Sequence, residues 1–139
     1  MTANADQSKL YTINQGVFAT FFGGPIGGTI LLAQNYKQFG CPQSARRAIV
    51  SGIIITCALV PVTLILPQNT PNAVLPIGYS IAFRIIAERL QGTELKSRIE
   101  QGAERQSWWR AIGIAVVAFL ITALALFGGL LGLTFLFQS

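Results

Sequence analysis

The sequence predicts an all-α membrane protein, a bundle of about four transmembrane helices that forms a single membrane domain over residues 1–139. The first observation is that Asp, Glu, Lys and Arg are absent from three segments of 27, 36 and 29 residues, which are 10–36, 48–83 and 111–139. A helix needs about 20 apolar residues to cross a bilayer, so each segment is long enough for a span. The second observation is the composition, which is 52% hydrophobic and only 11% charged, whereas soluble domains carry about 25% charged residues.

The first span is expected at about residues 15–34, with Tyr11 and Tyr36 as aromatic flanks of the kind found at membrane interfaces. Its centre carries the run Gly23-Gly24-Pro25-Ile26-Gly27-Gly28. Proline lacks an amide hydrogen and clashes with the preceding helical turn, and the glycines before it offer little resistance to bending. We therefore expect a kinked helix that breaks near the middle of the membrane.

The second and third spans are expected at about residues 48–66 and 73–90, joined by a charge-free turn with two prolines. The third is the weakest of the predicted spans, because it is short and carries Arg84 and Glu88. If this third segment, Ala73–Leu90, is re-entrant, the bundle has three full spans instead of four.

The fourth span is expected at about residues 109–137, and the paired Trp108 and Trp109 mark its basic end as an interface. Eight of the ten Lys and Arg residues lie in or beside two connections, 35–47 and 91–108. By the positive-inside rule these connections are cytoplasmic. Four spans then place both termini outside, which is an N-out/C-out topology.

A candidate binding site combines the break in the first span with an intramembrane charge. Transporters place broken helices at mid-membrane, where freed backbone groups bind ions or substrates. An arginine inside a span is a functional candidate, although Arg84 can also pair with Glu88 at i+4 or extend to the interface. We favour this pairing or extension for Arg84, and close packing for the glycines. The candidate residues are Gly23, Gly24, Pro25, Gly27, Gly28, Arg84 and Glu88.

Two further sets of residues are expected to contact other molecules. Small residues at i and i+4 let two membrane helices approach closely, and this spacing occurs in the first and fourth spans. The predicted helix-packing residues are Gly24, Gly28, Gly128 and Gly132. Basic and aromatic side chains beside the fourth span are expected to bind the headgroups of anionic lipids. These residues are Lys96, Arg98, Arg105, Trp108 and Trp109.

Several chemistries are not indicated by the sequence. The chain has no histidine, and its two cysteines, Cys41 and Cys57, are expected at different depths, so neither a disulfide nor a zinc site is predicted. No phosphate-binding loop, nucleophile motif or dinucleotide fingerprint occurs. The net charge of +5 is concentrated in the two connections, which is typical of membrane topology rather than of nucleic-acid binding. We expect no enzyme activity, no metal and no cofactor.

Short segments spread over most of the chain form a recognisable set. They are Phe22-Gly23-Gly24-Pro25, Leu32-Ala33-Gln34-Asn35-Tyr36, Ala45-Arg46-Arg47-Ala48, Glu88-Arg89-Leu90-Gln91-Gly92 and Ser107-Trp108-Trp109-Arg110. Together they resemble a group of small, uncharacterised bacterial inner-membrane proteins with several transmembrane helices. The resemblance implies a bacterial inner membrane and adds no catalytic or binding residue.

The sequence favours a non-enzymatic function. The predicted function is that of an assembly or accessory subunit, which acts by helix packing in a homo-oligomer or a larger membrane complex. The alternative is a small channel or transporter with its site at the Gly23–Gly28 break and Arg84, although the internal repeats usual in transporters are not evident. The expected partners are the lipid bilayer, including anionic lipids, and a second copy or another membrane protein, but not nucleic acid.

Overall fold

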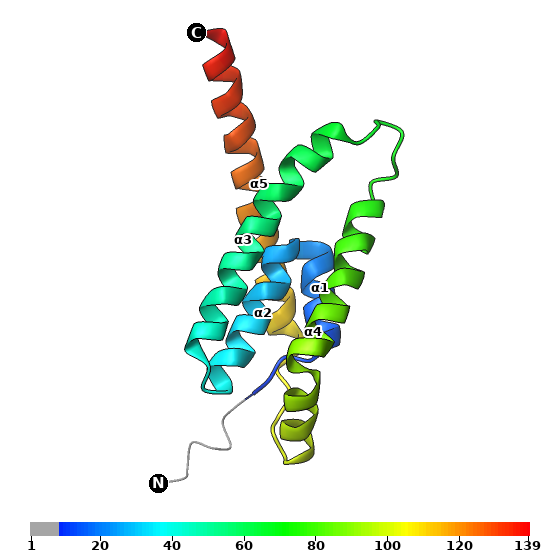
Figure 1. Cartoon of the computed structure of the whole chain (residues 1–139), viewed down its shortest axis with the longest axis vertical. Coiled ribbons are helices and arrows are strands. Elements are labelled where there is room, and N and C mark those ends of the chain that lie inside the picture. Colours follow the sequence, from blue (N-terminus) through cyan, green and yellow to red (C-terminus); the bar gives the residue numbers. More distant parts are fainter. Residues whose placement is uncertain (1–8) are drawn as a thin grey trace.

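The computed structural model describes residues 9–139, and the regular secondary structure in this range is helical. The predicted all-α class is confirmed. The helices are α1 (Ile13–Gly23), α2 (Pro25–Gln38), α3 (Pro42–Ile65), α4 (Val74–Glu100) and α5 (Trp108–Gln138). The long helices α3, α4 and α5 run alternately up, down and up, and the short helices α1 and α2 lie among their lower halves (Figure 1).

Two of the helices, α3 and α5, are long and apolar enough to cross a membrane. They contain 24 and 31 residues and overlap the predicted spans 48–66 and 109–137. Only 11% of the most apolar stretch of each helix is buried within the chain. Because soluble proteins rarely expose contiguous apolar surface of this extent, the two helices are suited to lipid rather than to water.

The segment 15–34 is not one continuous helix, and the prediction of a single span there is wrong. The chain reverses at Gly24, so α1 and α2 form an antiparallel hairpin whose open end joins Tyr11 to Asn35. Gly24 has a φ of 77°, which favours glycine, and Pro25 starts a new helix where its missing N–H group leaves no hydrogen bond unmade. With 11 and 14 residues, the two helices are about 17 and 21 Å long, too short to cross a core about 30 Å thick.

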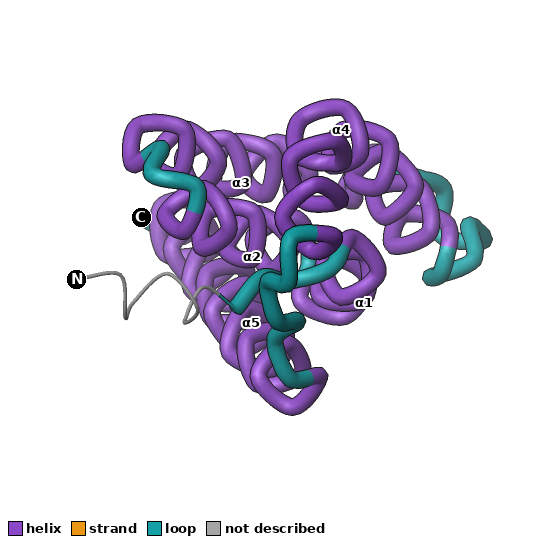
Figure 2. The backbone as a smooth tube through the Cα atoms, turned by 90° about the horizontal axis from the view of Figure 1, so that it is seen from below, coloured by secondary structure: helices purple, strands orange, loops and turns teal. Residues whose placement is uncertain are grey.

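The end of the bundle where α2 meets α3 and α4 meets α5 is called the basic end here, because Lys and Arg residues gather there. The hairpin lies at this end and is the hub of the fold, because it contacts all three long helices. Helix α2 packs on α3, α1 packs on α4 and α5, and α3 and α4 are not packed directly on each other. Figure 2 looks along the bundle from the basic end, with α1 and α2 between the three long helices. The basic residues at this end are Lys9, Lys37, Arg46, Arg47, Lys96, Arg98, Arg105 and Arg110.

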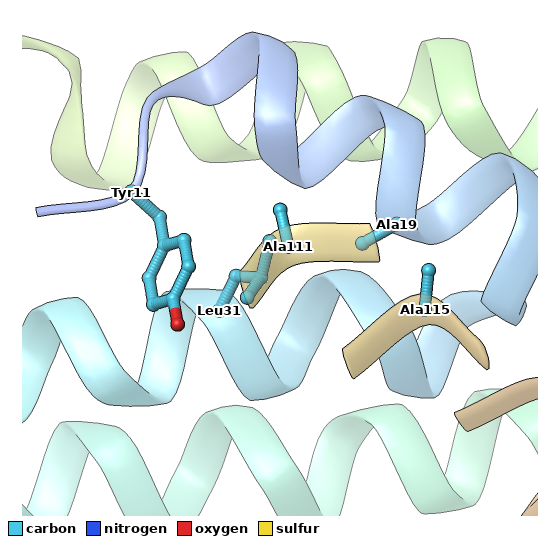
Figure 3. Close-up of a cluster of buried hydrophobic side chains, with 5 residues drawn as sticks. All are labelled: Tyr11, Ala19, Leu31, Ala111 and Ala115. Atoms are coloured by element: carbon cyan, nitrogen blue, oxygen red, sulfur yellow. The ribbon is translucent and has the colours of Figure 1, made fainter. Parts of the chain in front are cut away.

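Small residues allow α1, α2 and α5 to approach closely. An added Cβ atom on Gly23 would lie 2.8 Å from the carbonyl oxygen of Ala115 in α5. Gly27 lies even closer to the backbone of Ala19 in α1. Neither glycine therefore has room for a side chain. Figure 3 shows the adjoining cluster of side chains that point into one shared space, which consists of Tyr11, Ala19, Leu31, Ala111 and Ala115.

Helix α4 takes the place of two predicted elements. It runs without interruption through the predicted span 73–90 and through residues 91–100 of the predicted connection 91–108. The helix continues because Gln91 and Leu95 extend its buried stripe, so contact with the hairpin does not stop at residue 90. The segment that turns back is therefore the α1–α2 hairpin and not residues 73–90. The predicted connection 35–47 is likewise reduced to the three residues between α2 and α3.

Candidate functional site

The Gly23–Gly28 run forms the tip of the hairpin. The tip lies level with Thr122 of α5, the side chain nearest to Gly24, about 21 Å along α5 from its first residue. An added Cβ atom on Gly28 would lie 2.6 Å from a ring carbon of Phe83 in α4. Gly23, Gly27 and Gly28, three of the glycines predicted to pack or to bind, thus make close contacts between helices of the same chain.

Arg84 is not brought to the hairpin tip. Its Nε donates a hydrogen bond to Glu88 Oε1 at 3.1 Å, and its Nη1 donates to Asn14 Oδ1 at 3.4 Å, near the open end of the hairpin. The preceding residue, Phe83, faces the hairpin glycines, and the Arg84 side chain is about half exposed. The predicted pairing with Glu88 is confirmed. The transporter alternative requires Arg84 to lie at the helix break, and within residues 9–139 it does not lie there.

A buried polar cluster that the sequence analysis does not single out closes the open end of the hairpin. The Asn35 side chain accepts a hydrogen bond from the Tyr11 N–H group and donates one to the Tyr11 carbonyl, each at 2.8 Å. It also donates to Gln91 Oε1 at 3.2 Å, and Gln91 donates to the Leu32 carbonyl at 2.9 Å. Because a buried amide without its partners is costly, this cluster fixes the register between α1, α2 and α4.

A second set of hydrogen bonds ties the start of the hairpin to the connection between α4 and α5. The Leu10 N–H group donates to the Glu104 carbonyl at 2.9 Å, and the Gln106 N–H group donates to the Leu10 carbonyl at 2.8 Å. The buried Gln15 side chain donates to the Gln106 carbonyl at 2.7 Å, and Gln15 also forms a capping box with Thr12. The first turn of α1 is thereby held at the basic end.

The hydroxyl group of Tyr11 is buried at the same end. Burial raises the pKa of this hydroxyl above its ordinary value, and the positive charge of Arg110 opposes that change to a smaller extent. The hydroxyl therefore stays neutral at physiological pH, and the Tyr11 ring packs as part of the cluster in Figure 3.

Helical periodicity contains a signal for Gln91 that the sequence analysis does not use. The buried residues of α4 follow one another at intervals of three or four: Ser80, Phe83, Ala87, Gln91 and Leu95. A polar residue on such a stripe needs a hydrogen-bonding partner inside the fold. Asn35 has no comparable signal, because α2 is buried around most of its circumference.

The residues predicted to meet anionic lipid headgroups lie at the basic end. Two of them are engaged within the chain, since Arg98 lies 4.8 Å from the centre of the Phe39 ring and Trp108 packs edge-on against an aromatic ring of α1. The other three are exposed, and they are Lys96, Arg105 and Trp109.

Beyond the hairpin tip, α5 continues as an isolated apolar helix. It extends past Thr122 for about 24 Å, at 1.5 Å per residue, and residues 123–138 are exposed. Apart from its chain neighbours and the backbone of α5 itself, no described atom lies within 4 Å of a Cβ atom added to Gly128 or Gly132. This predicted packing pair therefore has no partner among residues 9–139.

Two hollows lie on either side of the hairpin tip. A groove of about 510 Å³ lies between α3 and α4 with α2 as its floor, and a pocket of about 220 Å³ lies beyond the tip between α3, α4 and α5. Pro25 and Tyr79 line both hollows and separate them. The groove has the size of a small-molecule site and a largely apolar wall, so it is better suited to a hydrophobic ligand than to an ion.

Comparisons with protein families, with curated proteins and with solved structures find no match for this chain. Within residues 9–139, no three His, Cys, Asp or Glu side chains are grouped so that they could hold a metal ion. The features that carry functional information are therefore the hairpin hub, the uncovered half of α5 and the groove between α3 and α4.

Proposed function

We propose that this chain is a multi-pass protein of a bacterial inner membrane that has no enzyme activity and acts as an assembly subunit. In this proposal, two copies associate through the outer half of α5, the part that follows Thr122. The bacterial location rests on the resemblance described above, and the membrane location rests on the exposed apolar surfaces of α3 and α5.

The observation that supports this assembly is the uncovered pair Gly128 and Gly132. By contrast, the closely spaced small residues Ala111 and Ala115 at the other end of α5 are covered by the hairpin. Small residues leave a shallow depression in which the backbone of a second helix gains close van der Waals contact. The outer half of α5 has no charge, so its partner must also be apolar. An identical helix related by a two-fold axis meets this requirement.

We also propose three membrane crossings, by α3, α4 and α5, with the α1–α2 hairpin entering and leaving on the basic side. This arrangement is supported by the position of Lys9 at the basic end, where its Nζ atom lies 3.8 Å from Oε2 of Glu104. The N-out topology expected from the sequence puts Lys9 on the opposite side from the other basic residues. The arrangement proposed here, with the basic end and Lys9 cytoplasmic and the C-terminus outside, agrees better with the positive-inside rule.

Cysteine labelling in cells tests this topology. In a chain with Cys41→Ser and Cys57→Ser, we expect a membrane-impermeant maleimide to label Asn69→Cys, in the loop between α3 and α4, in intact spheroplasts. Lys9→Cys should react only after the membrane is permeabilised, because the basic end faces the cytoplasm. Labelling of Lys9→Cys in intact spheroplasts would mean that residues 15–34 do cross the membrane.

The mass of the detergent-solubilised protein tests the assembly. We expect a dimer by light scattering, and we expect Gly128→Leu to raise its dissociation constant by about tenfold or more, which corresponds to about 1.4 kcal/mol. The bulky side chain prevents the close approach of the two helices. The matched control is Gly113→Leu, a substitution in the same helix at a glycine that also has open space around it. A monomeric wild-type protein, or equal weakening by both substitutions, contradicts the proposal.

A further inference from the structure

The groove between α3 and α4 extends over the depth of one bilayer leaflet. Its lining residues run from Ser44 to Ile55 on α3 and from Leu90 to Tyr79 on α4, which correspond to about 16 Å along each helix. Half of a hydrocarbon core about 30 Å thick is about 15 Å. Because α3 and α4 are not packed on each other, the groove opens sideways between them.

The middle of the groove offers little to a polar ligand. The hydroxyl groups of Thr20 and Thr29 line the groove, but each donates its hydrogen bond to a carbonyl of its own helix, at 2.8 and 3.0 Å. Ser51 of α3 and Tyr79 of α4 also line this part of the groove, and most of the remaining residues are apolar, including Leu32, Phe83 and Ile86. A hydrocarbon chain loses no hydrogen bonds on entering such a site, whereas a hydrated ion or sugar loses several.

The end of the groove at the basic end has different chemistry. Arg47 lies there with the hydroxyl-bearing side chains of Tyr36 and Ser44. Arg47 is exposed and has no ion pair within residues 9–139, where Glu88, Glu94 and Glu104 pair with other basic residues. An arginine presents a planar set of N–H donors that fits a phosphate group. The mouth of the groove is therefore complementary to an anionic headgroup.

We propose that this groove binds one anionic phospholipid of the cytoplasmic leaflet, with an acyl chain along α2 and the phosphate group at Arg47. The apolar length of one leaflet, the lateral opening and the unpaired guanidinium group are the three properties that such a lipid requires. The acyl chain ends at Pro25 and Tyr79, where the hairpin tip closes the groove. The site is distinct from the exposed Lys96, Arg105 and Trp109 at the ends of α4 and α5.

Native mass spectrometry of the full chain in neutral detergent, titrated with phosphatidylglycerol, tests the proposal. We expect one lipid to be retained per chain, and Arg47→Gln to raise its dissociation constant about tenfold, the effect of one lost hydrogen bond to a charged group. The matched control is Arg46→Gln, which removes the same charge from the adjacent residue, one that does not line the groove. This control should change the constant by less than about twofold.

A second pair of variants tests the position of the acyl chain. Ala82 is an exposed residue that lines the groove, so we expect Ala82→Trp to fill the groove and abolish the one-lipid complex, whereas Ala82→Ser leaves it intact. Glycerol phosphate should not displace the lipid, because it has no acyl chain. Equal effects of Arg46→Gln and Arg47→Gln, equal affinity for phosphatidylcholine, or full binding by Ala82→Trp would each overturn the proposal. Gly128→Leu should retain the lipid, so failure of the dimer and failure of this site are distinguishable.

Discussion

Replacement of Gly27 by alanine is expected to destabilise the fold by about 2 kcal/mol. The added methyl group would overlap the carbonyl group of Ala19 and would contact Ala118 of α5. Both the hairpin and its packing on α5 would have to open, because the overlapping atom of Ala19 belongs to the backbone and not to a flexible side chain. In a thermal melt followed by circular dichroism in detergent, we expect the apparent melting temperature to fall by about 5 °C or more.

The control for this experiment is Gly78→Ala in α4, where an added Cβ atom meets nothing within 4 Å. Alanine is a better helix former than glycine by about 1 kcal/mol, so this variant should melt at the same temperature as the wild type or higher. The two identical substitutions are thus expected to shift stability in opposite directions. If Gly27→Ala and Gly78→Ala have the same apparent melting temperature, the close contact between α1 and α2 does not exist in the folded protein.

Replacement of Asn35 by leucine is expected to cost about 3 kcal/mol or more, although the side chain keeps nearly its size. It leaves the N–H and carbonyl groups of Tyr11 and the Oε1 atom of Gln91 without their partners, and a buried polar group left unpaired costs about 1 to 3 kcal/mol. Because these hydrogen bonds close the hairpin, hydrogen exchange of the Leu10 and Tyr11 amides should become faster by at least about a hundredfold.

Asn69→Leu is the matched control, since Asn69 is an exposed residue in the loop between α3 and α4. Substitution at such a position usually changes stability by less than about 0.5 kcal/mol. The exchange measurement shows whether the hairpin is held closed by Asn35 or by the contacts of Leu10. Slow exchange of the Leu10 and Tyr11 amides in Asn35→Leu would mean that the contacts of Leu10 with residues 104–106 hold the hairpin closed without Asn35.

At Gly24 the local sequence correctly predicts a break, but the single kinked helix predicted for residues 15–34 is wrong. The Gly-Gly-Pro sequence predicts a break, and the break is present. Both a kink and a reversal use these same residues, however, and a charge-free segment of 27 residues accommodates either one long helix or two short ones. The reversal is fixed by Asn35 and Tyr11, which are 24 residues apart, and such distant pairing is not encoded in local spacing.

Contacts within one helix were easier to predict. The Arg84–Glu88 pair follows from i,i+4 spacing alone, and the long apolar helix α5 follows from its charge-free length and its paired tryptophans. The face of α5 that packs on the hairpin differs from the predicted packing face, which contains Gly128 and Gly132. Alanines at positions 111, 115 and 118 carry that face, and their spacing of four and three is the helical signal that marks it.

The hub position of the hairpin has a consequence for the order in which the protein is made. The hairpin is synthesised before the rest of the bundle, yet Gln15 bonds to Gln106, which lies 91 residues further along the chain. Asn35 likewise lacks Gln91 until α4 has been synthesised. Residues 13–38 therefore cannot reach their final hydrogen bonding until Gln91 of α4 and Gln106 of the connection after it have been synthesised. A nascent chain that stops before Gln91 therefore holds a hairpin whose Asn35 side chain lacks one of its partners.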